Sequence, residues 1–415
     1  MLKTRQKQRR LLEAFGLLVA AALCLGSTAH QLALLTVPDV PISDFGRDLV
    51  AARAAAEGRN PYSYVARLDP SVQGVPGDWM VGHSPLSVVL AHPAVNSPDL
   101  GSAESKARLV TLLGVWLLGL GLAVMAHRSG WPYPASASVM LLVPATTFAV
   151  EDVRWVQGVA LAGVLMVLVL GLRERGKTRV GAVLMGTMVA WRPWMAPIAL
   201  MLPRSHSLRA DAGIALGTAV VATAVALQSL GGLPSLEKWI AEVLPDVLTQ
   251  WRQWRGNGSL TSALPSLGLA SAVYIAAILT MIGARFRLSD DLWPLVASVL
   301  VLAASPLVWG HYVLGLYPGI IWTLLKRGQS YSRVGIFVIL GVVAIPGGIE
   351  SLAQGSAASE SIIAVGIVGT SLVLLRIATG KRPLFGQHNE AGHRLRDAST
   401  NQSFVTGGKS HKGAS

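Results

Sequence analysis

The sequence has little charge and a single cysteine. Asp, Glu, Lys and Arg make up 14% of its 415 residues, well below the roughly one quarter that is typical of soluble domains. This shortage excludes a soluble multidomain protein of this length. The one cysteine, Cys24, lies inside an apolar stretch, so an intramolecular disulfide and a cysteine-ligated metal site are excluded as well.

Long apolar runs are present instead. Hydrophobic residues make up 52% of the chain and its mean hydropathy is +0.51. Residues 14–37, 109–126, 212–230 and 335–349 are runs of about the length that a helix needs to cross a hydrocarbon core. The composition therefore predicts an all-α polytopic membrane protein with about 10–12 membrane helices.

The chain has a net charge of +13, and the positions of its basic residues indicate how the protein is oriented in the membrane. Basic residues precede the first apolar run and recur near positions 128, 173–179, 204–209, 285–287, 326–333 and from 376 onward. The positive-inside rule places these clusters in the cytoplasm, where anionic lipid accounts for them without nucleic acid. Ser27-Thr28-Ala29 resembles a signal-peptide cleavage site. The apolar run continues to Val37, which favours a retained helix.

This arrangement requires two hairpins whose ends are all cytoplasmic. The first covers residues 180–202 and breaks at Arg192-Pro193, and the second covers 292–325 and breaks near Ser305-Pro306. Such breaks are tolerated where the backbone is buried in protein or lines a cavity. We expect both termini in the cytoplasm, a transmembrane domain over residues 1–377, and a disordered tail over 378–415.

Two long external loops then remain, over residues 38–106 and 231–265. Within the first loop, residues 45–57 have the spacing of an amphipathic helix lying along the membrane interface. Residues 84–95 are apolar but too short to span, which predicts a second interfacial or re-entrant helix.

Asp44 follows the first apolar run closely and is the candidate general base. A carboxylate at the membrane surface could deprotonate a hydroxyl nucleophile. It could equally serve as the N-cap of the helix that follows. Asp48, one turn further on, is more simply interpreted as a residue on a solvated helix face.

Arg192 is the candidate ligand of an anion. An arginine surrounded by so much apolar sequence requires an anionic partner, and a guanidinium suits phosphate. Glu151, Asp152 or Asp44 could also be that partner.

Further polar residues lie near the external ends of the predicted spans. Arg154 and Gln157 come from the segment between two spans, and the Gln157 amide could hold sugar hydroxyls or cap a neighbouring helix. Trp251 and Asn257 belong to a stretch that interleaves tryptophan, arginine and amide side chains. Its tryptophans could instead form an interfacial belt.

His311 and Tyr312 lie at the second break. A histidine there could bind phosphate or carry protons, and a purely structural hydrogen bond is the alternative. The sequence contains no HExxH motif, no Walker loop, no Gly-x-Gly-x-x-Gly and no Gly-x-Ser-x-Gly. No internal repeat supports an inverted-repeat transporter.

Several stretches occur in the order found in one enzyme family. They are Asp44-Phe45, Ala51-Ala52, Gly58 with Asn60-Pro61-Tyr62, Ser84-Pro85-Leu86, Gln157-Gly158, Arg192-Pro193, Asn257-Gly258-Ser259-Leu260, and Ser305-Pro306 through His311-Tyr312. On these residues the chain resembles glycosyltransferase family 87, the polyprenyl-phosphate-mannose-dependent mannosyltransferases of the GT-C superfamily. The resemblance covers about residues 40–320 and rests on shared order and spacing.

The chain departs from the family pattern at three positions. His83-Ser84-Pro85 stands where the family commonly has Tyr-Pro-Pro, Val159 replaces an asparagine, and Arg192 replaces a lysine. These departures leave the sugar and the acceptor open.

The resemblance implies a GT-C-like helix bundle in the plasma membrane with an active site on its extracytoplasmic face. Asp44 would act as general base, and Arg192 and His311 would bind the donor phosphate. Gln157, Arg154, Trp251, Asn257 and Tyr312 would contact sugar or acceptor. The donor would be a polyprenyl-phosphate hexose, with mannose expected, and the acceptor a glycolipid or glycan. No metal or other cofactor is implied.

Two other functions remain open. A lipid or glycan transporter or flippase would place polar residues through both halves of the bundle, whereas here they gather on one side. A catalytically silent scaffold would tolerate loss of Asp44 and His311.

Overall fold

The computed structural model describes residues 2–36, 42–63, 83–97, 99–201, 208–252, 264–285, 291–305, 309 and 311–327. This part of the chain is mostly helical and contains no strand. Its helices are α1 (Leu2–Thr36), α2 (Asp44–Ala56), α3 (Pro85–Ala91), η3 (His92–Ala94), α4 (Leu100–Arg128), α5 (Tyr133–Leu142), α6 (Thr147–Trp155), α7 (Val159–Glu174), α8 (Thr178–Trp191), η4 (Pro193–Met201), α9 (Leu208–Ser229), α10 (Leu233–Lys238), η5 (Trp239–Val243), α11 (Leu244–Arg252), α12 (Leu267–Arg285), α13 (Trp293–Ala304) and α14 (Tyr312–Arg327).

Within the described residues, three helices are long and apolar enough to cross a membrane. They contain Leu11–Thr36, Leu100–Arg128 and Ala210–Ser229, and the bent pair α5 and α6, with a 43° bend, would make a fourth. Large apolar side chains on α1 and α9 are exposed, among them Leu25, Leu216 and Val221, as expected of surfaces that face lipid. An all-α membrane protein is therefore supported, while the count of about 10–12 spans stays a prediction.

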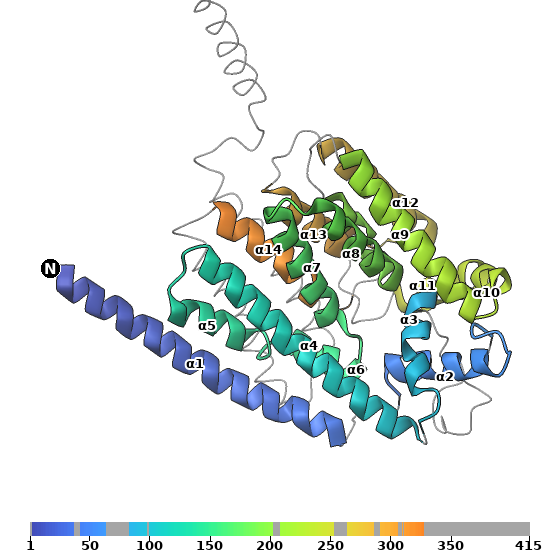
Figure 1. The fold of residues 1–415 in the computed structure, drawn as a ribbon, viewed down its shortest axis with the longest axis horizontal. Helices are drawn as coiled ribbons and strands as arrows, with labels where there is room; N and C mark the ends of the chain where they lie inside the picture. The colour runs from blue at the N-terminus through green and yellow to red at the C-terminus, as the bar shows by residue number, and fades with distance from the viewer. Residues whose placement is uncertain are drawn as a thin grey trace, which may run out of the picture.

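The centre of the bundle is formed by α4, α7 and α14 (Figure 1). Leu118, Met166 and Tyr317 are fully buried between these helices. A side chain on Gly163 of α7 would place its Cβ 2.8 Å from the Leu314 carbonyl oxygen of α14. Glycine thus allows close packing of helix backbones, as is common between membrane helices.

The breaks predicted at the two hairpins separate helices in the structure. Helix α8 ends at Trp191, Arg192 follows with φ −126° and ψ 83°, and the chain resumes as the 3₁₀ helix η4, which packs against α8. The second hairpin corresponds to α13 and α14, which contact each other. Residues 306–308 of its break, the apolar run 335–349 and the tail 378–415 lie outside the described residues.

Helices α4, α7 and α14 end together. Lys326 of α14 forms an ion pair with Glu174 of α7 at 2.8 Å, and the charge of Arg128 of α4 acts on Glu174. Arg173 lies over the Trp322 ring, 5.1 Å from its centroid. We call this end of the bundle the basic end. The starts of α7 and α14 lie at the opposite end, which Figure 1 shows beside α2, α3 and α6.

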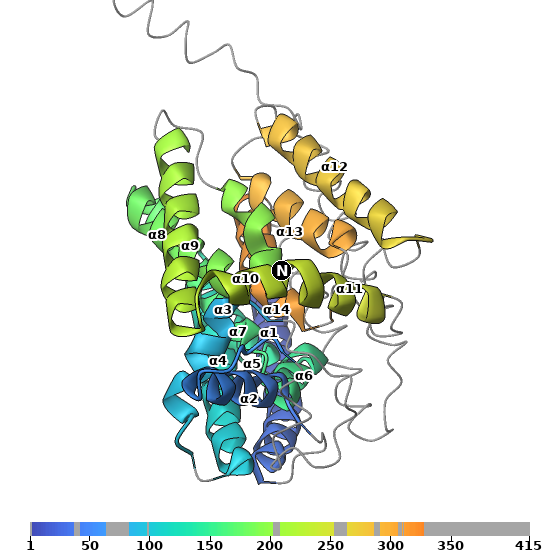
Figure 2. The same cartoon turned by 90° about the vertical axis from the view of Figure 1, so that its right-hand side faces the viewer.

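The structure describes parts of both predicted external loops. In helix α2, Asp44, Asp48, Leu49 and most of the alanines are buried, because α3, η3 and α4 pack against it (Figure 2); its placement along the membrane interface stays a prediction. Small alanine side chains permit that close enclosure. The stretch expected as a second long loop, 231–265, contains the helices α10, η5 and α11.

Candidate functional site

Asp44 is the first residue of α2, and it does not cap that helix. The cap is Ser43, whose Oγ accepts a hydrogen bond from Gly46 N at 3.0 Å. The N-cap interpretation of Asp44 is therefore wrong. Its side chain is buried, 7% exposed, and Oδ1 lies 3.0 Å from Arg47 Nη2. The carboxylate is thus available for interactions across the site.

The start of α2 is fixed to α4 by Glu104. Glu104 Oε1 accepts hydrogen bonds from Ser43 N at 2.8 Å and from Ser43 Oγ at 2.7 Å. Its other oxygen lies 3.2 Å from Arg108 Nη2, in an ion pair that is almost fully buried. A Cβ on Gly46 would lie 2.2 Å from Glu104 Oε1. Glycine at this position therefore allows the contact that positions Asp44.

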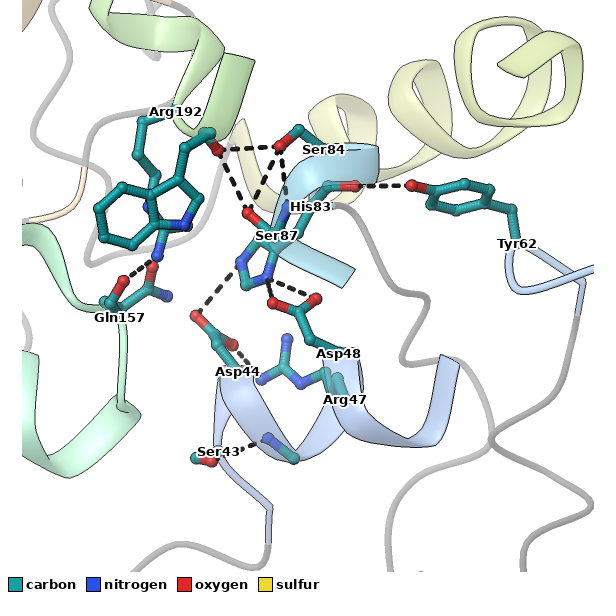
Figure 3. Close-up of polar contacts among 12 residues, drawn as sticks. Ser43, Asp44, Arg47, Asp48, Tyr62, His83, Ser84, Ser87, Gln157 and Arg192 are labelled. Atoms are coloured by element: carbon teal, nitrogen blue, oxygen red, sulfur yellow. Dashed lines mark hydrogen bonds and ion pairs between the residues drawn. The ribbon is translucent and has the colours of Figure 1, made fainter. Parts of the chain in front are cut away.

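Asp48 is buried, so its interpretation as a solvated residue is wrong. His83 Nδ1 lies 2.9 Å from both Asp48 carboxylate oxygens. His83 Nε2 is 3.7 Å from Asp44 Oδ2. Figure 3 shows the imidazole beside both carboxylates. Sequence reasoning missed His83 as a site residue, although the departure from Tyr-Pro-Pro marked the position.

Tyr62 supports the other side of this histidine. Its hydroxyl donates a hydrogen bond to the His83 carbonyl oxygen at 3.4 Å (Figure 3). Burial raises the pKa of the Tyr62 hydroxyl, and the negative charge of Asp48 raises it further. Tyr62 therefore remains a neutral hydrogen-bond donor at physiological pH.

Arg192 occupies the break after α8 and is buried, 7% exposed. Its Nη2 donates a hydrogen bond to the Gln157 carbonyl oxygen, and its guanidinium lies 5.0 Å from the Trp191 ring centroid. The Trp191 carbonyl accepts hydrogen bonds from Ser84 Oγ at 2.8 Å and Ser87 Oγ at 3.2 Å. The first turn of α3 thus holds the end of α8 beside α2 (Figure 3).

Gln157 is held between two left-handed residues. Val156 has φ 55° and Gly158 has φ 65°. A positive φ is uncommon for a β-branched residue and costs energy. A Cβ on Gly158 would lie 3.2 Å from the Trp191 ring. This tight turn directs the Gln157 carbonyl toward Arg192, and Gln157 itself is buried.

Asp152 provides the structural anion near Arg192. Its carboxylate accepts hydrogen bonds from Val159 N and Ala160 N, both at 2.9 Å, and so caps α7. The charge of Arg192 acts on this fully buried group. Of the internal partners considered for Arg192, Asp152 is therefore one that the structure supports. The Nε of Arg192 still has no hydrogen-bond partner among the described residues.

His311 and Tyr312 lie at the start of α14, and both are buried. The charges of Asp44, Arg192 and His83 all act on His311. Tyr312 stacks on Trp194 of η4, with ring centroids 4.2 Å apart and an interplanar angle of 3°. Trp194 is a neighbour that sequence reasoning did not identify.

The structure thus brings together Asp44, Arg192, His311, Gln157 and Tyr312 at the end of the bundle opposite the basic end. Buried polar atoms of this group that have no hydrogen-bond partner within the described residues include Arg192 Nε, His311 Nε2 and Gln157 Oε1. Buried polar groups are almost always paired. The unpaired donors and acceptor are what a polar, anionic ligand would satisfy.

Of the other predicted site residues, only Arg154 has a described side chain. Arg154 forms an ion pair with Glu151 on its own helix, and the Trp155 indole donates to the same carboxylate at 3.0 Å. Trp251 belongs to α11 by its backbone, and Asn257 lies outside the described residues. Roles for these three stay predictions.

No group of three or more His, Cys, Asp or Glu suited to a metal ion occurs in the described part of the chain. Independence from metal stays a prediction.

Comparison with protein-family models and with curated proteins gives no match for this chain. The geometry of the site is therefore the basis for proposing a function.

Proposed function

We propose that this protein is an integral-membrane glycosyltransferase. It transfers a hexose, with mannose the expected sugar, from a polyprenyl-phosphate donor to a glycolipid or glycan acceptor by inverting displacement. The observation that carries the proposal is the buried group of one carboxylate, Asp44, with two nitrogen ligands, Arg192 and His311. These side chains come from α2, the α8 break and the start of α14.

In the proposed reaction, Asp44 acts on the acceptor, whereas Arg192 and His311 act on the donor phosphate. Asp44 takes the proton from an acceptor hydroxyl as its oxygen attacks the anomeric carbon. The bond from that carbon to the phosphate oxygen breaks, and the phosphate leaves with the electron pair. Inversion follows because attack and departure occur on opposite faces of the sugar.

The leaving phosphate gains negative charge, which Arg192 and His311 stabilise. Preorganised donors in a buried site act strongly on developing charge. The guanidinium has an unpaired Nε, and a guanidinium can bind phosphate through two parallel hydrogen bonds. The start of α14 adds the partial positive charge of a helix N-terminus.

The position of the site supports chemistry on the extracytoplasmic face. Arg128, Arg173 and Lys326 lie at the basic end of α4, α7 and α14, and cytoplasmic ends of membrane helices are rich in lysine and arginine. The site lies at the other end of α7 and α14. A lipid-linked donor in the outer leaflet would reach it from the membrane.

The experiment is transfer of labelled mannose from polyprenyl-phosphate mannose to lipid, in membranes that contain the protein, measured in parallel with EDTA and with added divalent metal ions. Wild type should transfer, and Asp44→Asn should be about 10²–10⁴-fold slower, because it lacks the general base. Asp99→Asn is the matched control. Asp99 caps α4 through Ser102 N, and asparagine caps equally well.

Two results would overturn the proposal. One is absence of transfer by wild type from any polyprenyl-phosphate hexose. The other is full transfer by Asp44→Asn. Lipid or glycan movement across proteoliposomes without sugar transfer would favour a flippase instead.

A further inference from the structure

His83 lies between two carboxylates of the same helix. Its Nδ1 contacts both oxygens of Asp48 at 2.9 Å, and its Nε2 faces Asp44 Oδ2 at 3.7 Å. Asp44 and Asp48 lie one turn apart on α2, and His83 directly precedes Ser84, the N-cap of α3. The imidazole thus bridges the candidate base to a second, buried carboxylate (Figure 3).

The contact with Asp48 defines which nitrogen of His83 is free. A carboxylate that accepts from Nδ1–H fixes the ring orientation and the tautomer, and it stabilises the imidazolium once that forms. The Nε2 lone pair is then directed at Asp44. The gap of 3.7 Å exceeds a hydrogen bond, but catalytic contacts are often long in unliganded structures and shorten with substrate.

A proton taken by Asp44 must leave before the next turnover. Arg47 forms an ion pair with Asp44, and the charges of Asp44 and Arg192 both act on His311. Both arginines carry charge permanently and accept no proton. The His311 side chain is buried, 4% exposed. The side chain of His83 is 23% exposed. Among these neighbours it combines a basic nitrogen with access to solvent.

We propose that His83, oriented by Asp48, passes the proton from Asp44 to solvent in each turnover. This inference rests on the proposed glycosyl transfer. After attack, protonated Asp44 gives its proton to His83 Nε2 and becomes a carboxylate again. The imidazolium, paired with Asp48, then releases a proton to water. The net products are the new glycoside, polyprenyl phosphate and one proton.

The test is chemical rescue of His83→Ala in the mannose-transfer assay. We expect kcat to fall about 10–100-fold, at or below the lower end of the range of about 10²–10⁴ for groups that transfer a proton in the transition state, with KM for the donor unchanged. Added imidazole should restore the rate. Substituted imidazoles should restore it in proportion to their basicity, because the step is a proton transfer.

His92→Ala is the matched control, since His92 lies in η3 directly after α3. It should keep the wild-type rate and gain nothing from imidazole. Asp48→Asn should lower kcat while leaving His83 in place, and it should gain little from imidazole.

The outcomes separate the two proposals. Transfer by wild type with loss in Asp44→Asn, but no rate loss or no imidazole rescue in His83→Ala, would overturn the relay and leave the glycosyltransferase standing. A folded His83→Ala protein that is rescued equally by all imidazoles, whatever their basicity, would reduce His83 to a structural link. No transfer by wild type would remove both.

Discussion

Arg192 and His311 are buried side chains whose hydrogen bonding is incomplete among the described residues. Leaving a buried donor or acceptor unpaired costs about 1–3 kcal/mol. An unpaired buried group calls for an explanation, and a polar ligand is the explanation that we propose at this site. At Arg192 the guanidinium already donates to the Gln157 carbonyl and interacts electrostatically with Asp152. The Nε–H of Arg192 is thus the donor that we propose binds a substrate.

Substitution of Arg192 tests this assignment. Arg192→Gln should lower the transfer rate about 10²–10³-fold, the usual cost of removing one preorganised donor. Arg192→Lys should lose less, because lysine retains the charge but not the planar donor geometry. Steady-state rates with labelled donor provide the measurement. Arg175→Gln, at an exposed position near the basic end, is the control. Equal activity of Arg192→Gln and wild type would contradict the assignment.

The turn between α6 and α7 and the break after α8 position the site together. Val156 and Gly158 adopt left-handed backbone on either side of Gln157, and the turn packs against Trp191 at the end of α8. Backbone that departs from helix at membrane depth needs such internal partners. Moving this turn would move the carbonyl that orients Arg192.

A pair of glycine substitutions isolates this contact. Gly158→Ala and Gly176→Ala both place alanine at positive φ, 65° and 72°, which costs about 1–2 kcal/mol each. Only the Cβ at Gly158 meets a neighbour, the Trp191 ring at 3.2 Å, whereas Gly176 has open space.

Thermal unfolding in detergent should therefore show the larger loss of Tm for Gly158→Ala, and transfer activity should fall in that variant alone. Similar Tm and activity in the two variants would show that the contact with Trp191 does not matter.

The contact of Glu104 with Ser43 and Arg108 attaches α2 to α4, and its loss should destabilise the protein. Glu104→Ala removes the partner of Arg108 and the acceptor of Ser43. Breaking a buried ion pair from one side costs about 3–5 kcal/mol. Glu57→Ala, which breaks the exposed pair with Arg59, should cost at most about 1 kcal/mol. Denaturant unfolding measures both, and equal losses would refute the anchoring role of Glu104.

The elements that sequence predicts best are those with local signals. An arginine followed by proline inside an apolar run indicated the break at Arg192, and the short apolar run 84–95 indicated the short helix α3. Asp48 was misinterpreted because helical periodicity shows which face carries charge but not what covers that face. The pairing of His83 with Asp48 joins residues 35 positions apart, so no local pattern reveals it. Whether the site acts as proposed is still a prediction.

At the scale of the whole molecule, the chain separates a basic end from the candidate site. α7 and α14 both begin at the site and end beside Arg173 and Lys326. If the basic end faces the cytoplasm, the site faces outward.

Cysteine accessibility tests this orientation. Cys24 is the sole cysteine and can be replaced by alanine. Ser63 lies between α2 and α3, Arg175 follows α7, and both are exposed. In intact cells a membrane-impermeant maleimide should label Ser63→Cys and spare Arg175→Cys until the membrane is permeabilised. The reverse pattern would contradict an extracytoplasmic site.

In the proposed function, the Asp44 carboxylate and the side-chain nitrogens of Arg192 and His311 form a single substrate site. A cryo-EM structure of the protein with a non-hydrolysable polyprenyl-phosphonate sugar measures this directly. We expect the phosphonate within hydrogen-bonding distance of Arg192 and His311, with the anomeric carbon between it and Asp44. A headgroup bound at the basic end, or one that contacts none of these three side chains, would contradict it.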